Sequence, residues 1–161
     1  MFHRIRVSAV VPEGERVLLV EACAPETRPS VGGMTGRYWN FPGGGLEGDE
    51  SVLEGAEREL FEETGLRIVA ERVVYVHEVI HRLTPVDARE RPLRQIELYV
   101  LGRRPTGEIT LNDPDVLDAR FMTRAEVAGV AAYPPMLAGL FWEDLSHGFP
   151  EMRFLGSHYV G

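Results

Sequence analysis

The chain has 161 residues, 44% of them hydrophobic, which is enough for one domain with a continuous core, and no change in composition marks a second domain. The single cysteine, Cys23, excludes an intramolecular disulfide, no apolar run approaches the ~20 residues of a membrane span, and the lack of lysine among the 17 basic residues excludes lysine Schiff-base chemistry. The net charge of −8 argues against general nucleic-acid binding, and because the first residues run into a strand pattern without a signal peptide, a cytoplasmic protein is expected.

Two apolar, β-branched runs open the chain. Residues 5–11 and 17–22 read as strands, and Pro12-Glu13-Gly14-Glu15 between them is typical of a turn, so we expect a hairpin. Residues 23–38 contain two prolines and three glycines without a hydrophobic period. This composition predicts a long loop that reaches a strand at 39–41 and borders a site.

A glycine-rich loop then leads into a well-marked helix. The three glycines at 43–45 have no side chains to intrude, so the backbone there can approach a ligand closely. Ser51 with Glu54 three residues later is a capping-box pattern, and Gly65 is suited to the position after a helix. The spacing predicts a helix over 51–64.

Three carboxylates share one face of this helix at its C-terminal end. Glu59, Glu62 and Glu63 stand at i, i+3 and i+4, where like charges repel by roughly 0.2–0.5 kcal/mol per pair. The helix dipole opposes each of them by a further ~0.3–1 kcal/mol. A bound divalent cation would reverse both penalties, and ligands that are all oxygen favour Mg²⁺ or Mn²⁺ over zinc. The alternative is a solvated acidic helix face.

A basic segment separates the next two predicted strands, 73–81 and 95–102. Residues 82–94 form an arginine-rich loop in an otherwise acidic protein, and arginine's planar fork suits phosphate recognition. The loop arginines, together with one from the earlier loop, are candidates for contact with a substrate phosphate or base; ordinary solvated charge is the alternative. These candidates are Arg37, Arg82, Arg89, Arg91 and Arg94.

The last third of the chain predicts a strand at 117–121 and a helix from 123 to about 132, which begins with the capping pattern of Thr123 and Glu126. Beyond it, residues 134–161 should complete the core or form an interface, with the core favoured. The aromatic residues of this tail are Phe141, Trp142, Phe149 and Phe154. Three earlier aromatic residues could stack on a base, although a place in the core is favoured for each: Trp39, Tyr75 and Tyr99.

The residues from Gly44 to Leu66 fit the pattern G-x5-E-x7-R-E-U-x-E-E-x-G-U, in which U is a bulky aliphatic residue. This resembles the signature of the Nudix hydrolases, with every defined position filled by Gly44, Glu50, Arg58, Glu59, Leu60, Glu62, Glu63, Gly65 and Leu66. The resemblance implies a single α/β domain over residues 1–161, an α/β/α sandwich with a mixed central sheet. It also implies that this loop and helix hold Mg²⁺ or Mn²⁺ against a diphosphate.

By the same resemblance, Glu59, Glu62 and Glu63 bind the metal together with the main-chain carbonyl of Gly43. Gly44 and Gly45 would lie against the substrate. Within the catalytic set of Glu50, Arg58, Glu59, Glu62 and Glu63, Glu50 and Arg58 resemble organising residues, with Arg58 holding Glu50 or the helix carboxylates in place through bidentate hydrogen bonds. Direct catalysis by Glu50 is the alternative.

The implied reaction is hydrolysis of a phosphoanhydride bond by water. The general base is open, because relatives use either a helix glutamate or an acidic residue from a distant strand or loop. Glu63 and Glu62 come first, followed by Glu97, which interrupts an apolar run and is also a candidate metal ligand. Asp87 and Glu90 rank lower.

Three other functions are alternatives to hydrolysis of a small-molecule substrate. A noncatalytic nucleotide-sensing domain would usually have lost some of the glutamates, and an isoprenoid-diphosphate isomerase would need a catalytic cysteine in a better position than Cys23. Removal of diphosphate from an RNA 5′ end would need a basic channel. Nucleoside triphosphates, nucleotide sugars, ADP-ribose and dinucleoside polyphosphates all remain open as small-molecule substrates. The habit of the family favours a homodimer.

Overall fold

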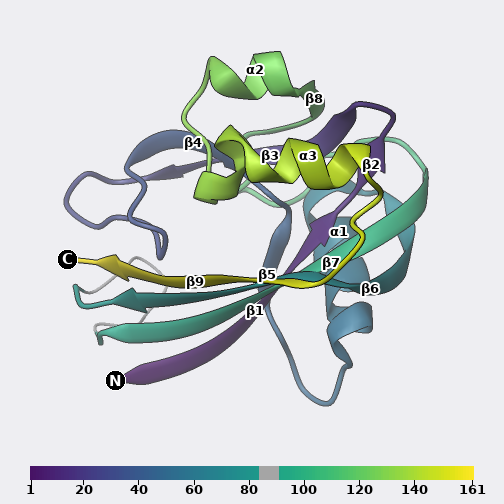
Figure 1. Ribbon diagram of the computed structural model, residues 1–161. Helices are drawn as coiled ribbons and strands as arrows, with labels where there is room; N and C mark the ends of the chain where they lie inside the picture. The colour runs from purple at the N-terminus through teal and green to yellow at the C-terminus, as the bar shows by residue number, and fades with distance from the viewer. Residues whose placement is uncertain (84–90) are drawn as a thin grey trace.

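A mixed β-sheet forms the centre of the protein, as the computed structural model shows (Figure 1). The structure describes residues 1–83 and 91–161. The order across the central sheet is β5 (Gly43–Gly45), β1 (Phe2–Val10), β7 (Leu93–Thr106), β6 (Arg67–His81) and β9 (Arg153–Val160). Strand β1 is parallel to β7 and antiparallel to β5, while β6 is antiparallel to β7 and parallel to β9. The predicted mixed sheet is confirmed.

A second, antiparallel sheet contains β2 (Pro12–Glu13), β3 (Arg16–Ala24), β4 (Gly36–Asn40) and β8 (Asp118–Thr123). Both β4 and β8 pair with β3. The helical elements are α1 (Val52–Thr64), α2 (Arg124–Ala128), the 3₁₀ helix η1 (Pro135–Ala138) and α3 (Leu140–Ser146).

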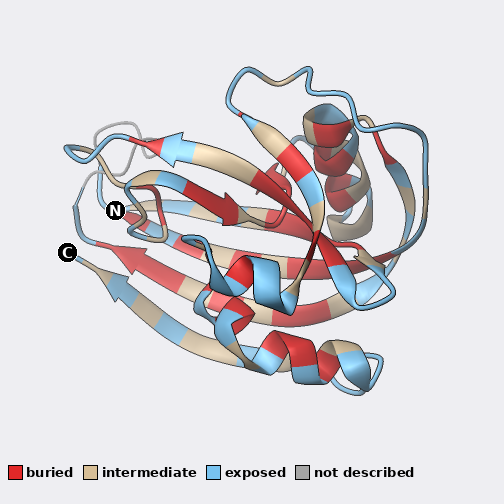
Figure 2. Cartoon of the chain, turned by 90° about the horizontal axis from the view of Figure 1, so that it is seen from above, coloured by how far each residue is buried: buried red, intermediate tan, exposed pale blue. Residues whose placement is uncertain are grey.

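Helices cover both sides of the central sheet because successive side chains of a strand point to opposite faces. On one side, Leu60 of α1 packs with Ala9 of β1 and with Val11 and Leu18. On the other side, Val10 of β1 belongs to a larger cluster that includes residues of β3, η1 and α3. This arrangement confirms the predicted α/β/α sandwich, and Figure 2 shows the buried residues concentrated between the layers.

The C-terminal segment contributes to this larger cluster. Phe141, Trp142 and Phe149 are buried in it, as the core interpretation predicts. Phe154 departs from the core alternative, because it lies on the edge strand β9 and is 66% exposed. The three earlier aromatic residues are also buried in this cluster, which favours their role in the core: Trp39, Tyr75 and Tyr99.

The predicted hairpin between 5–11 and 17–22 is largely wrong. Strand β1 pairs with β5 and β7 in the central sheet, whereas β3 belongs to the second sheet. Only the short β2 forms the hairpin, with Pro12 opposite Val17 and Glu13 opposite Arg16. Alternation shows that a segment is extended but not which strand pairs with it, so the change of sheet after Val10 left no sequence signal.

Several boundaries also moved. The loop predicted at 23–38 shrinks to 25–35 because β3 and β4 extend into it, and β6 begins at Arg67, directly after α1. Register shifts in β6 interrupt its alternation, which explains why its first half was missed. Helix α2 ends at Ala128, before Gly129, and not near 132. No helix within the described residues has the length and apolar character needed to cross a membrane.

Candidate active site

Helix α1 forms where the capping residues predicted it. The Ser51 hydroxyl accepts a hydrogen bond from the Glu54 backbone N–H at 3.2 Å, and the Glu54 carboxylate accepts one from the Ser51 backbone N–H at 2.7 Å. At the other end, Gly65 takes the left-handed conformation with φ of 75° and donates to the Phe61 carbonyl. The helix therefore starts and stops for local reasons, and the positions of its carboxylates follow from these two ends.

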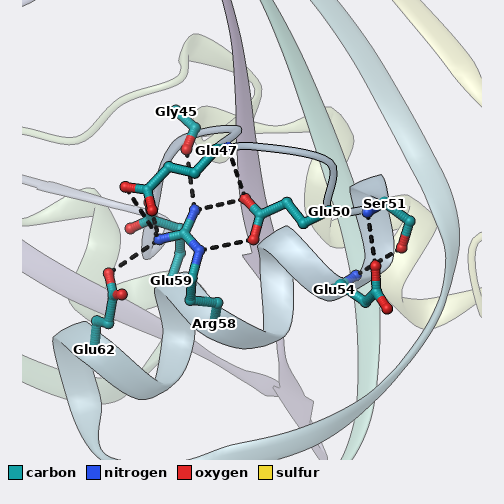
Figure 3. A network of polar contacts seen from close by, with 8 residues as sticks. All are labelled: Gly45, Glu47, Glu50, Ser51, Glu54, Arg58, Glu59 and Glu62. Atoms are coloured by element: carbon teal, nitrogen blue, oxygen red, sulfur yellow. Dashed lines mark hydrogen bonds and ion pairs between the residues drawn. The ribbon is translucent and has the colours of Figure 1, made fainter.

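Arg58 organises the acidic face of α1 (Figure 3). Its Nε and Nη2 donate to the two oxygens of Glu50 at 2.8 and 2.7 Å, which is the bidentate arrangement that the resemblance implied. Its Nη1 donates to Glu59 at 2.9 Å and to Glu62 at 3.1 Å. One guanidinium thus holds the loop carboxylate and two helix carboxylates together, and the Gly45 carbonyl also accepts from Nη2 at 3.1 Å.

The glycine loop contacts two carboxylates of the same helix, Glu59 and Glu63. The Gly43 backbone N–H donates to Glu63 Oε2 at 3.1 Å. A Cβ atom added at Gly44 would lie 2.4 Å from Glu59 Oε1, so only glycine leaves room for the Glu59 carboxylate in this position. Both glycines belong to β5, which pairs with Val7 and Ser8 of β1. The central sheet therefore positions the loop against the helix.

Two of the helix carboxylates are perturbed by their surroundings. Burial raises the pKa of Glu63 to about 8, although the nearby Arg6 charge and the Gly43 N–H act in the opposite direction. Burial also raises the pKa of Glu59, against the effect of Arg58. For both carboxylates, the neighbouring positive charge is therefore too small to offset the loss of solvation in the folded protein. Glu62, in contrast, is exposed to solvent.

This donor set fits a hard divalent cation chemically. Glu59, Glu62, Glu63 and the Gly43 carbonyl offer only oxygen, and a cation would relieve the charge deficit of the two perturbed carboxylates. Within the ranges that the structure describes, no three acidic, histidine or cysteine side chains are gathered closely enough to hold an ion. Instead, Arg58 donates to Glu59 and Glu62, while Glu63 accepts a hydrogen bond from Gly43.

A cavity opens beside these carboxylates, between the two sheets. Its lining includes Arg6 and Ser8 of β1, Gln95, Glu97 and Tyr99 of β7, Tyr38 and Asn40 of β4, and also Ser30, Val31, Gly32, Phe41 and Tyr133. Burial lowers the pKa of Arg6, but the negative charges of Glu97 and Glu63 outweigh that effect and raise it. Arg6 is therefore the positive charge that connects the cavity with the acidic face of α1.

Glu97 belongs to the cavity and is saturated with hydrogen bonds. Its Oε1 accepts from Gln95 Nε2 at 2.7 Å, and its Oε2 accepts from the hydroxyls of Tyr99 at 2.5 Å and Tyr133 at 3.1 Å. His77 Nδ1 lies 3.4 Å from the same oxygen. Burial alone would raise the pKa of Glu97, yet these contacts and the charge of Arg6 lower it. Its position among donors explains a buried acidic residue in an apolar strand.

The four candidate arginines that the structure describes have partners elsewhere. Arg37 pairs with Glu21 at 3.2 Å and Arg94 with Glu78 at 3.3 Å. The guanidinium of Arg82 lies over the ring of Tyr159, and that of Arg91 lies over Phe2. Arg89 lies outside the described residues, as do Asp87 and Glu90.

Sequence reasoning missed Arg6, Gln95, Tyr38 and Tyr133 as candidate site residues. A weak signal existed for Arg6, which breaks the apolar run of an otherwise buried strand, and the same is true of Gln95 beside Glu97. Nothing in their own neighbourhoods indicated that β1 and β7 would place them next to each other.

Comparison with known proteins agrees with this geometry. The family model described as the NUDIX domain matches residues 2–140, which is most of the chain. The chain belongs to the Nudix family. A solved structure of a Nudix hydrolase from Nitrosomonas europaea superposes with a TM-score of 0.68, covering 99% of this chain and 80% of that one at 19% identity, and so shows the same fold.

Sequence relatives match over shorter stretches. An RNA pyrophosphohydrolase from Mesorhizobium japonicum is 37% identical over 68 residues, which are 42% of this chain and 39% of that protein. Phosphatase NudJ from Escherichia coli K12 is 45% identical over 42 residues, 26% of this chain and 28% of that protein. The chain thus matches well under half the length of these curated relatives.

Proposed function

We propose that this Nudix protein hydrolyses a phosphoanhydride bond in a nucleoside diphosphate derivative, in a reaction that depends on Mg²⁺ or Mn²⁺. The observation that carries the proposal is the cluster that Arg58 organises from Glu50, Glu59 and Glu62, with Glu63 beside it against the glycine loop. We further propose that residues 1–161 act as one domain, because α3 and the residues after it help to close the core.

The ion would be held by Glu59, Glu62, Glu63 and the Gly43 carbonyl, as the charge deficit at Glu59 and Glu63 supports. When bound, it would neutralise charge on the diphosphate and lower the pKa of a water molecule. Arg58 keeps the carboxylates in place, and Arg6 adds positive charge at the side where the cavity opens.

Attack of water at phosphorus requires a proton acceptor. Glu63 is the first candidate because it lies against the glycine loop beside the proposed ion, within reach of a water molecule held there. Glu62 is the second, since it is exposed beside the same face of α1. Glu97 is a weaker candidate, because both of its oxygens already accept hydrogen bonds in the cavity.

The test is turnover with Mg²⁺, with Mn²⁺ and with EDTA across a panel of nucleoside triphosphates, nucleotide sugars, ADP-ribose, dinucleoside polyphosphates and a 5′-triphosphorylated RNA oligonucleotide. Each product is identified by the phosphates it retains. We expect metal-dependent cleavage of at least one class, because the carboxylate cluster serves the diphosphate and not the rest of the substrate.

Two glutamine variants on the same helix separate the site from the helix itself. Glu62→Gln should lower kcat/KM by about 10²-fold or more. The matched control is Glu54→Gln at the other end of α1, where glutamine preserves the capping box, so activity should be retained. A folded protein that binds nucleotides and metal but cleaves nothing on the panel would contradict hydrolysis and favour the sensing alternative.

A further inference from the structure

The cavity between the sheets has a polar wall built by two neighbouring strands. Strands β1 and β7 run parallel, with Arg6 beside Glu97 and Ser8 beside Tyr99. Residues that are partners in a parallel pair point to the same face, and so do residues two positions apart on one strand. Arg6, Ser8, Gln95 and Glu97 therefore share the face that lines the cavity.

Hydrogen bonding fixes the orientation of the Gln95 side chain in this wall. Gln95 is buried, and its Nε2 donates to Glu97 Oε1 at 2.7 Å. The other oxygen of Glu97 accepts from two tyrosine hydroxyls, so this carboxyl group acts only as an acceptor. The amide nitrogen of Gln95 must then face Glu97, since a flipped amide would place two acceptors together.

This orientation leaves Gln95 Oε1 as an acceptor without a donor. Among residues 1–83 and 91–161, only two buried side-chain polar atoms lack a hydrogen-bond partner, Gln95 Oε1 and His81 Nε2. His81 does not line the cavity, whereas Gln95 does. Buried polar atoms in folded proteins are almost always satisfied by protein or by ordered water, so an unpaired acceptor on a residue that lines the cavity indicates that a molecule held there, water or ligand, supplies the donor.

The rest of the cavity indicates what kind of ligand carries that donor. Its water-accessible space is about 80 Å³, and one water needs about 10–15 Å³, so several waters or one planar ring can fit. Tyr38, Phe41 and Tyr133 supply aromatic surface. The carboxylate of Glu97 and the unpaired oxygen of Gln95 disfavour an anionic group at this end. A neutral heteroaromatic ring with an N–H group satisfies all three conditions.

We propose that Gln95 is the specificity-determining residue of the cavity and that its Oε1 accepts a hydrogen bond from an N–H group on the substrate's base. The inference rests on the proposed function, in which the diphosphate lies at α1. Arg6 lies between the two regions, because it pairs with Gly45 of the glycine loop on one side of β1 and with Glu97 of β7 on the other. A nucleotide can therefore place its phosphates at the carboxylates and its base in the cavity.

Equilibrium binding tests the inference without turnover. Calorimetry in EDTA would compare nucleoside triphosphates that differ in one N–H group: adenosine with purine riboside, guanosine with inosine and with 1-methylguanosine, cytidine with pyrimidin-2-one riboside, and uridine with 3-methyluridine. For at least one pair, the wild-type protein should bind the donor-bearing member about tenfold to 100-fold more tightly. The inference is overturned if no pair is discriminated, including the case in which no nucleotide binds.

Gln95→Met should abolish that preference, because methionine keeps the length of the side chain but offers no comparable acceptor. Tyr133→Phe is the matched control: it removes a donor to the same Glu97 and keeps Gln95 Oε1, so the ratio of affinities should persist. A preference that survives in Gln95→Met, or that falls equally in both variants, would overturn the assignment.

A measurement without substitution guards against a variant that fails to fold. Gln95 is the only glutamine in the chain, so selective labelling with glutamine carrying ¹³C at the side-chain carbonyl gives one resonance that needs no further assignment. Its shift should move with the donor-bearing nucleotide and stay in place with the other member of the pair. Equal shifts would contradict the proposal.

The two proposals fail in different ways. If the protein prefers the donor-bearing nucleotide but hydrolyses nothing, the role of Gln95 stands and the proposed enzymatic function fails. If the protein hydrolyses a substrate but shows no preference within any nucleotide pair, the enzymatic function stands and the role of Gln95 fails.

Discussion

The carboxylate site of α1 and the cavity between the sheets lie side by side but are built in different ways. The first comes almost entirely from residues 43–63, joined by contacts within the loop and the helix. The second draws its lining from β1, β4 and β7, from the loop at 30–32 and from Tyr133. The group proposed to act on the diphosphate is thus encoded locally, whereas the surface proposed to recognise the rest of the substrate depends on how distant strands pair.

The two regions also differ in their charge balance. At α1, burial raises the pKa values of Glu59 and Glu63, because the nearby positive charges do not offset the loss of solvation. In the cavity, Glu97 has enough donors that its pKa is lowered despite burial, and the unpaired atom is a neutral amide oxygen. The first region is suited to a cation and the second to a neutral donor.

The strongest test of this contrast is Glu63→Gln. Loss of a metal ligand or proton acceptor should lower kcat/KM by about 10²–10⁴-fold. The stability of the metal-free protein should instead increase in the variant at alkaline pH. Because the folded pKa of about 8 exceeds the ordinary 4.5, the contribution of Glu63 to the stability of the metal-free protein is most favourable below pH 4.5 and is lost as the pH rises through 8. Glutamine removes that loss.

Thermal unfolding in EDTA between pH 5 and pH 9 measures the effect of Glu63→Gln. The melting temperature of the wild type should fall more steeply over this range than that of the variant, and adding Mg²⁺ at pH 8 should raise the wild-type value more. Identical pH slopes would mean that Glu63 does not carry the charge deficit.

Gly44→Ala tests the close approach between loop and helix. The new Cβ would lie 2.4 Å from Glu59 Oε1, and because that oxygen ends a flexible side chain, the carboxylate should move while the fold persists. A misplacement of this size should lower kcat/KM by about 10²-fold. In the control, Gly129→Ala, the nearest atom to the added Cβ is 3.5 Å away, which is an ordinary contact, so activity should be retained.

Asp144→Asn tests a partly buried ion pair on α3, away from the carboxylate site of α1. Buried Asp144 accepts from the Tyr75 hydroxyl at 2.6 Å and from Arg153 at 3.0 Å, which ties α3 to β6 and β9. Losing its charge should destabilise the protein by about 1.5–3 kcal/mol at pH 7, measured by urea unfolding. The chemistry at α1 should persist, since none of these residues contacts the carboxylate cluster.

The pH dependence of stability gives Asp144 a second signature. Burial would raise its pKa, but hydrogen bonds from Arg153 and Tyr75 lower it below the ordinary 3.8. Its stabilising effect is therefore complete above about pH 4 and is lost as the pH falls through the lowered pKa. The difference between wild type and variant should shrink on acidification, and a difference that stays constant would contradict this account.

The smallest effect is expected from Ser51→Ala. Loss of the capping hydroxyl should cost about 1 kcal/mol of unfolding free energy, while kcat/KM stays near the wild-type value because the acidic face lies at the other end of α1. Thr123→Ala at the shorter α2 is the comparison, and its cost should be no larger. A drop in activity as large as that in Gly44→Ala would show that the carboxylate site depends on the whole helix.

Features that depend on residues close along the chain were predictable from the sequence, whereas features that depend on distant segments were not. The start of α1 at Ser51, its end at Gly65 and the bidentate pairing of Arg58 with Glu50 all involve residues close along the chain, and all were predicted. The partners of β1 were predicted wrongly, because its alternating pattern is equally compatible with a hairpin and with the central sheet. The arginine loop was favoured by composition, whereas Arg6, which lines the cavity, was overlooked.

The sequence by itself determined the family signature, the ends of α1 and the set of carboxylates on its face, because helix periodicity and capping are fixed by neighbours within a few residues. Only the tertiary structure decided that Arg6 and Ser8 would stand beside Glu97 and Tyr99, that Glu97 would be saturated with donors, and that Gln95 Oε1 would be left unpaired. The reason is physical: register between distant strands is set by the packing of the whole sheet, and no single segment contains that information.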